Sequence, residues 1–193
     1  MQTRNAKGRL FVVSAPSGAG KTTLCTLLRQ RFPDLVYSVS YTTRAPRKGE
    51  QNGVDYHFID TDTFLSLRSE QQWAEWAEVH GHYYGTAAAP IQAAVNAGKD
   101  VLLDIDVQGA MQILERFPDA VTIFIAPPSL AVLQKRLAAR GTDAPQTIAA
   151  RMRNAAAEMA YRGRYDHIVV NDRLERAAEQ LAGIVSRKRQ AQG

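Results

Sequence analysis

Short apolar runs alternate with helical patterns along most of the chain. The run Leu10–Val13 is continuous and ends in small residues, which is typical of a strand buried on both faces of a sheet. Similar runs occur at 101–103, 121–125 and 167–170. Segments with helical spacing separate them, at 21–31, 91–97, 110–117, 130–140, 146–161 and 173–188. This alternation predicts an α/β fold with one parallel sheet, right-handed crossovers and helices on both faces.

The stretch 37–86 breaks this rhythm. Polar and apolar residues alternate at 37–41, 56–59 and 75–79, Gly-bearing turns join these segments, and one short helical pattern lies near 62–69. Alternation of this kind is typical of strands with one solvated face. We therefore expect a small, mostly antiparallel insertion between two parts of the parallel sheet.

The composition limits the possible classes of protein. A chain of 193 residues with 45% apolar and 22% charged side chains is long enough for one compact domain with a small insertion. The single cysteine, Cys25, excludes an internal disulfide framework and a cysteine-rich zinc site, and we expect it to face the core. No apolar run approaches the roughly 20 residues of a membrane span, and the first residues lack an apolar signal region. We expect a soluble, cytoplasmic protein with no membrane partner.

The net charge of +5 suggests an anionic partner. Several cations lie beside turns or motifs rather than along one continuous stretch, a distribution that fits a phosphate pocket better than a nucleic-acid surface. These cations are Arg44, Arg47, Lys48, Arg136, Arg140, Arg151 and Arg153.

A phosphate-binding loop follows the first predicted strand. Residues 14–23 match the pattern G-x-x-x-x-G-K-[ST] at every fixed position except the first, which is Ala15. Gly18 and Gly20 would let backbone N–H groups turn toward phosphate oxygens, Lys21 would reach the β- and γ-phosphates, and the Thr22 hydroxyl could bind Mg²⁺. The alternative is a glycine-rich turn before a helix. A strand before the loop and a helix after it favour a site for a nucleoside triphosphate.

Two carboxylates follow the second predicted core strand. Asp104 and Asp106 alternate with Ile105, so both would face one side if the strand extended that far. A carboxylate near a loop threonine is common in Mg²⁺ sites of this type. The alternative is a strand end with two solvated aspartates.

A second group of polar residues lies in the predicted insertion. Arg44 and Arg47 are three positions apart around Pro46, and two guanidinium groups at this spacing can bind one phosphate. Other hydrogen-bonding side chains follow in the same segment, at Tyr56, Glu75, Tyr84 and Thr86. Singly they would be ordinary surface residues, but together with the arginines they suggest a mononucleotide site.

The order of these motifs resembles that of guanylate kinases. The similarity extends from about Arg9 to Arg187 and is carried by residues 14–23, 40–50, 55–58, 78–86, 103–109 and 125–129. A shared order of six motifs is more specific than a phosphate loop alone. Two positions depart from the commonest family pattern: Ala15 replaces a glycine, and Arg173 replaces the second aspartate of an Asn-Asp-Asp sequence.

The resemblance implies a GMP site. Residues at the positions of Ser40 and Glu75 read the guanine edge in guanylate kinases, and a carboxylate left unpaired by adenine would reject AMP. Thr86 stands where a hydroxyl assists base recognition. The family's phosphate contacts correspond to Arg44, Arg47, Tyr56 and Tyr84, and Asp104 and Asp106 would lie between the two substrates.

The resemblance also implies an ATP site. Arg136, Arg140 and Arg151 correspond to arginines that close over the ATP phosphates, and Asn171 and Asp172 fall near adenine. The loop residues would be Ala15, Pro16, Ser17, Gly18, Ala19, Gly20, Lys21, Thr22 and Thr23. Mg²⁺ would be bound by Thr22, waters and phosphates, with Asp104 in its outer shell. Lys21, Arg44, Arg140 and Arg151 would act in catalysis, and no general base is assigned.

The family pattern further implies a division of the chain. We expect a P-loop NTPase-type domain over 8–187, with a core at 8–36 and 87–187, a GMP-binding insertion at 37–86 and a lid at 137–156. The expected partners are ATP and GMP, with dGMP as a further acceptor and no nucleic acid, and assembly into a homo-oligomer is left open. The alternatives are a kinase for another acceptor, a non-catalytic phosphopeptide-binding module, and a nucleic-acid-binding protein.

Overall fold

A computed structural model describes residues 7–79, 81–139 and 144–190. The chain divides into two compact units. The first holds residues up to Leu10, Asp34–Leu103 and Gln108–Ala120, and the second holds Phe11–Pro33, Asp104–Val107 and the chain from Val121 onward. The positions expected for the acceptor base and its phosphate all fall in the first unit. The phosphate loop falls in the second.

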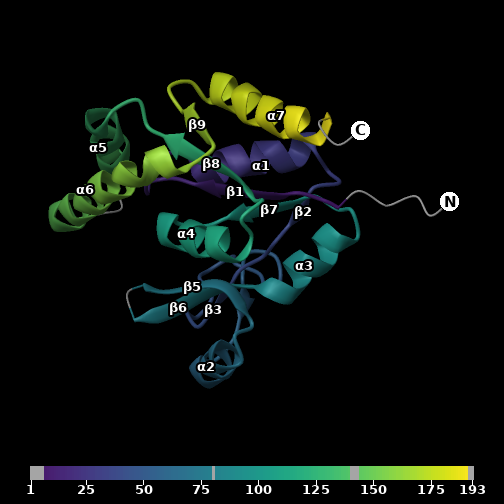
Figure 1. Cartoon of the computed structure of the whole chain (residues 1–193). Helices are drawn as coiled ribbons and strands as arrows, with labels where there is room; N and C mark the ends of the chain where they lie inside the picture. Colours follow the sequence, from purple (N-terminus) through teal and green to yellow (C-terminus); the bar gives the residue numbers. More distant parts are fainter. Residues whose placement is uncertain (1–6, 80, 140–143, 191–193) are drawn as a thin grey trace. The chain divides into compact units, whose positions relative to one another are not determined.

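A five-stranded sheet, flanked by helices, has the order β2-β7-β1-β8-β9 (Figure 1). The pairs β2 with β7, β1 with β8, and β8 with β9 are all parallel. Every residue of β1 and β8 is buried, which explains why these strands are continuous apolar runs in the sequence. The strand bounds are Leu10–Ser14 for β1, Val36–Tyr37 for β2, Val101–Asp104 for β7, Val121–Ala126 for β8 and His167–Val170 for β9.

The helices of the second unit follow the expected periodicity. Helices α1 and α7 pack on one another, and α5 and α6 form a separate pair. The α5–α6 contact is apolar and is centred on Leu133, Leu137 and Ala155. Their bounds are Lys21–Arg31 for α1, Leu130–Ala139 for α5, Pro145–Ala160 for α6 and Leu174–Gln190 for α7, with a 3₁₀ turn η1 at Tyr161–Arg164.

The first unit contains a four-stranded sheet of order β4-β3-β6-β5. Strand β3 pairs with β4 in parallel, whereas β3 with β6 and β5 with β6 are antiparallel, so the prediction of a mostly antiparallel sheet is confirmed. These strands are β3 (Tyr41–Thr42), β4 (His57–Phe58), β5 (Trp73–Val79) and β6 (His82–Ala87). The helices of this unit are α2 (Thr61–Ser69), α3 (Ala88–Asn96) and α4 (Val107–Arg116).

Two local predictions need correction. The alternating segment 37–41 is not one strand, because Tyr37 ends β2 of the large sheet and Tyr41 begins β3 of the small one. Strand β7 ends at Asp104, so Ile105 and Asp106 do not continue its alternation. The expectation that both aspartates face one side of a strand is therefore wrong in its premise.

No helix among the described residues is long and apolar enough to cross a membrane.

Candidate functional site

The phosphate loop has the backbone that its glycines predict. Gly18 and Gly20 have φ angles of 90° and 95°, in the left-handed region that L side chains rarely adopt. Ala15 has no positive φ and is buried. The first motif position therefore does not require glycine in this chain, which accounts for the one mismatch to the pattern.

Lys21 begins helix α1 at the end of the loop. Its ammonium group donates to the Ile105 carbonyl at 2.9 Å and forms an ion pair with the Asp104 carboxylate. Asp104 is thus a partner of the loop lysine in this structure. The side chains of Thr22 and Thr23 are exposed on the first turn of α1, where they are accessible to a ligand.

Asn171 supports the loop from the end of β9. Its side chain is 6% exposed, and its amide nitrogen donates to the Ala19 carbonyl at 2.8 Å. A Cβ atom on Gly20 would lie only 2.4 Å from this nitrogen, so the glycine is required by close approach as well as by its φ angle. The guanidinium of Arg136 donates to the Asn171 carbonyl at 2.8 Å. Asn171 therefore links an α5 arginine to the phosphate loop.

Two of the remaining residues predicted for the ATP site, Asp172 and Arg151, are described by the structure. Asp172 is exposed and accepts a hydrogen bond from the backbone of Arg173. Arg151 is half-buried on α6. Arg140 lies outside the described residues.

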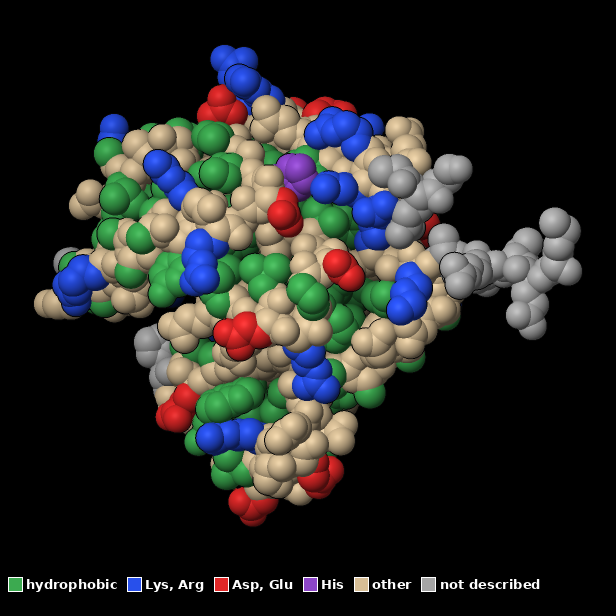
Figure 2. All heavy atoms as spheres, in the orientation of Figure 1, with side chains coloured by type: hydrophobic (Ala, Val, Ile, Leu, Met, Phe, Trp, Pro, Cys, Tyr) green, Lys and Arg blue, Asp and Glu red, His purple; other side chains and the backbone are tan. Residues whose placement is uncertain are grey.

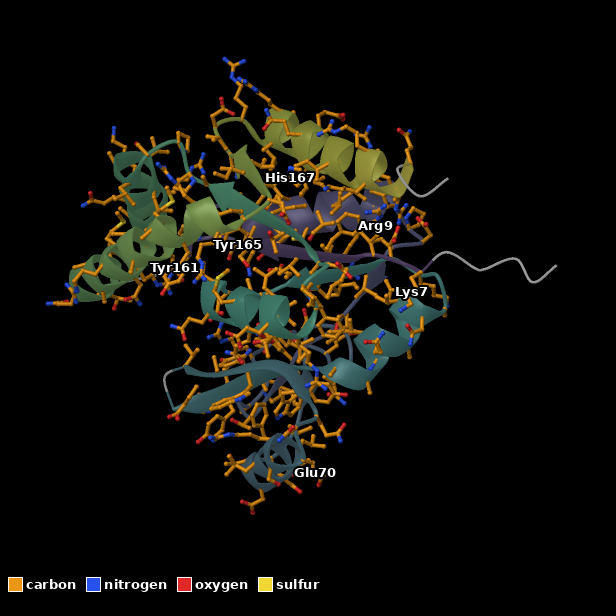
Figure 3. The ribbon with its side chains drawn as sticks, viewed as in Figure 1. Lys7, Arg9, Glu70, Tyr161, Tyr165 and His167 are labelled. Carbon is orange, nitrogen blue, oxygen red and sulfur yellow. The ribbon has the colours of Figure 1, made fainter. Side chains whose placement is uncertain are left out.

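Asp106 and two residues that sequence reasoning missed lie beside the loop. The Ser14 hydroxyl donates to the Asp106 carbonyl at 3.2 Å. Burial raises the pKa of Glu158, Asp106 adds to the rise, and the Ser17 amide and Lys21 oppose it. Burial also raises the pKa of Tyr165 to about 12, so this phenol stays neutral at physiological pH (Figure 3). Neither residue belongs to a local motif, and only the fold brings them to the loop.

A second set of predicted residues meets in the small sheet. Thr86 on β6 is opposite Glu75 on β5, and its hydroxyl donates to the Glu75 carboxylate at 2.5 Å. The Thr86 oxygen is also 3.2 Å from the Ser40 hydroxyl. Because a hydroxyl has one proton and Thr86 gives it to the carboxylate, Ser40 must be the donor to Thr86. A directed chain of hydrogen bonds thus ends on Glu75, whose residue is only 6% exposed.

The predicted phosphate contacts surround Arg44. Its guanidinium carbon lies 5.6 Å from the centre of the Tyr56 ring, and the Tyr56 and Tyr84 rings meet edge to face at 5.9 Å. Glu50 is the main cause that raises the pKa of Arg44, burial opposes it, and Tyr84 adds to the rise. The side chain of Arg47 is exposed. Glu50, which the sequence did not identify as a site residue, is therefore part of this cluster.

The described residues contain no group of three or more His, Cys, Asp or Glu side chains able to hold a metal ion. On the face shown in Figure 2, Lys and Arg side chains are spread out and mixed with Asp and Glu. This distribution gives no support to a basic nucleic-acid stripe on that face.

Comparison with known proteins identifies the family. The sequence model of the guanylate kinase family matches residues 7–188. The chain is 49% identical to the guanylate kinase of Dechloromonas aromatica over 92% of its own length and 88% of that protein. It is 50% identical to the guanylate kinase of Chromohalobacter salexigens over 95% of its own length and 86% of that protein.

A solved structure supports the same assignment. The crystal structure of guanylate kinase from Anaplasma phagocytophilum matches with a TM-score of 0.76 and 36% identity. The match covers 95% of this chain and 87% of that one. Sequence and fold agree, and the chain belongs to the guanylate kinase family.

Proposed function

We propose that this chain transfers the γ-phosphoryl group of ATP to GMP and releases ADP and GDP. The observation that carries the proposal is the buried Glu75 carboxylate, held by Thr86 in the same unit as the Arg44 cluster. A buried carboxylate suits a base with two adjacent donors, and a guanidinium suits a phosphate. We assign the reaction to purine nucleotide metabolism in the cytoplasm.

Guanine recognition would depend on the direction of the Ser40, Thr86 and Glu75 chain. The carboxylate would accept from N1–H and the 2-amino group of guanine. Adenine carries neither donor in this arrangement, so AMP would cover the buried carboxylate without donating to it, which is costly. The proposed contacts to guanine do not involve the sugar, so we expect dGMP to serve as an acceptor as well.

The acceptor phosphate would bind to Arg44, Arg47, Tyr56 and Tyr84. Arg44 and Arg47 supply charge, and the two tyrosines supply hydroxyl groups. A phosphate monoester is already an anionic nucleophile, so no strong general base is needed. This is why none of the carboxylates is assigned that role.

The donor triphosphate would bind to the loop and to Lys21. Backbone N–H groups at the start of α1 favour an anion, and the positive φ angles of Gly18 and Gly20, which glycine adopts readily, are compatible with close approach of a phosphate. Arg136, Arg140 and Arg151 would stabilise charge on the transferring group, and one arginine of this kind contributes roughly 10³ to 10⁵ in rate. Asn171 and Asp172 would lie on the adenine side. Asp104 and Asp106 would lie between the two phosphates.

Mg²⁺ fits this site as a companion of ATP. The exposed Thr22 hydroxyl follows Lys21 directly, and Mg²⁺ usually combines one or two protein oxygens with waters and phosphate oxygens. When bound, the ion neutralises charge on the β- and γ-phosphates. Thr22 would hold it directly, and Asp104 would orient Lys21 and bound water.

The proposal can be tested with a coupled assay for ADP. MgATP with GMP should give turnover, and AMP should give at least about 100-fold less, since adenine offers no donor to the buried Glu75 carboxylate. Glu75→Gln should reduce kcat/KM for GMP by a similar factor with the KM for ATP unchanged. Glu78→Gln, an exposed position on the same strand, is the matched control. Equal turnover of AMP by the wild-type protein would contradict the assignment.

A further inference from the structure

Glu50 is brought to the Arg44 cluster by a tight turn. The Glu50 amide donates to the Arg47 carbonyl at 3.0 Å, and Gly49 between them has a φ of 93°. A positive φ at the third position of a four-residue turn favours glycine. The turn folds the chain back, so that a carboxylate six positions after Arg44 faces its guanidinium.

The Glu50 carboxylate accepts hydrogen bonds from one edge of the Arg44 guanidinium. Its two oxygens accept from the two terminal nitrogens of Arg44, with Oε2 at 3.0 Å from Nη1 and Oε1 at 2.9 Å from Nη2. Oε2 also accepts from the Arg47 amide at 2.7 Å, and Nη1 also donates to the Ala45 carbonyl at 2.7 Å. The Arg44 and Glu50 side chains are 12% and 20% exposed. This two-point contact fixes the plane of the guanidinium as well as its position.

The other edge of Arg44 has a donor without a partner. Nε is buried, and no hydrogen bond to it is found among the described residues. A guanidinium carries five N–H donors, and the Nε–H and the second Nη2–H point in parallel from one edge. Two parallel donors match two oxygens of a phosphate.

We propose that Glu50 is a positioning residue for Arg44. Its carboxylate binds the Nη1–Nη2 edge of the guanidinium and leaves the Nε edge available to the acceptor phosphate. Glu50 then binds no substrate itself. This role rests on the proposed GMP site. The competing interpretation is that Glu50 occupies the place of the phosphate and must leave when GMP binds. The two interpretations predict opposite changes in GMP affinity when the carboxylate is removed.

The test compares GMP with guanosine, which differs only by the phosphate. Dissociation constants for both ligands are measured by calorimetry or NMR for the wild type and for Glu50→Gln. Positioning predicts that GMP binds about tenfold or more weakly and that guanosine binding is unchanged, because only the phosphate contact is affected. KM for GMP should rise in parallel, with KM for ATP unchanged. A GMP-specific rise in affinity would support competition and overturn the proposal, as would an unchanged ratio of the two constants.

Three further variants make the result decisive. Glu70→Gln removes the same charge in the same unit from an exposed carboxylate at the end of α2 and should leave both constants unchanged (Figure 3). Arg44→Met should abolish most of the preference for GMP over guanosine. If Arg44→Met lowers that preference and Glu50→Gln does not, only the role of Glu50 is wrong. If neither variant lowers it, the phosphate site itself is elsewhere. Glu50→Asp keeps the charge and should recover part of the GMP affinity if Glu50→Gln folds poorly.

Discussion

Gly20 and Asn171 form a contact whose energy can be isolated by a double-mutant cycle. The methyl group of Gly20→Ala would lie 2.4 Å from the Asn171 amide nitrogen. The alanine would also have to adopt a φ near 95°. The left-handed backbone costs about 1–2 kcal/mol for an L residue. Displacing the amide leaves it and the Ala19 carbonyl unpaired, which costs about 1–3 kcal/mol. We expect Gly20→Ala to lower the free energy of unfolding by about 2–5 kcal/mol.

The second substitution removes the amide itself. Asn171→Ala loses the 2.8 Å hydrogen bond to Ala19 and should cost about 1–3 kcal/mol. In the double variant the methyl group no longer displaces an amide, because that amide is absent. The two costs should therefore fail to add by about 1–3 kcal/mol.

Urea unfolding followed by circular dichroism would measure these free energies. Gly81→Ala is the matched control, because Gly81 has a φ of 77° and no atom within 4 Å of an added Cβ. It should show the backbone cost alone and should add to Asn171→Ala. If Gly20→Ala and Asn171→Ala also add within about 0.5 kcal/mol, the close approach is not what restricts this position to glycine.

Three further predictions each concern one side chain. Asp166→Ala should lower the free energy of unfolding by about 1.5–3 kcal/mol in urea titrations, because the buried Thr122 amide and hydroxyl both donate to that carboxylate at 2.8 Å. Burial lowers the pKa of His167, and the charge of Lys188 lowers it further. The stability that His167 contributes is therefore present above the unfolded pKa of about 6.5 and is lost as pH falls through the lower pKa of the folded state. His167→Gln should accordingly flatten the dependence of unfolding free energy on pH below about 6.5, and an unchanged slope would contradict this. Burial, with Asp104 adding, raises the pKa of the Cys25 thiol, so a thiol reagent should react with it only after the protein unfolds.

The long core elements could be predicted because burial leaves a regular pattern in the sequence. Strands β1 and β8 are buried along their whole length, and their apolar runs mark them. Strands β2, β3 and β4 have two residues each, too few for a period to be visible. Their pairing depends on partners distant in sequence, which explains why 37–41 was mistaken for one strand.

The site residues were predictable in type but not in their connections. Residue type and resemblance indicated Ser40, Glu75 and Thr86 separately. The direction of their hydrogen bonds depends on the register of β5 against β6, and a register shift between Trp73 and Glu75 helps set it. A one-residue slip would turn Glu75 to the other face of the sheet. The proposed base recognition would therefore depend on strand pairing, which local sequence does not specify.

Asn171 and Glu50 are polar residues at the proposed ligand sites whose side chains contact other protein groups. The Asn171 amide was expected near adenine, and in the structure it holds a loop carbonyl 152 positions earlier in the chain. Glu50 was not among the predicted site residues, although it lies in the segment 40–50 that carries the resemblance. A carboxylate beside a phosphate site is electrostatically unfavourable unless a cation lies between them. Arg44 is that cation, and its two edges allow it to bind a carboxylate and a phosphate at once. In the proposed arrangement the negative charge of Glu50 is compatible with an anionic substrate, since its carboxylate would contact the Arg44 guanidinium and not the phosphate.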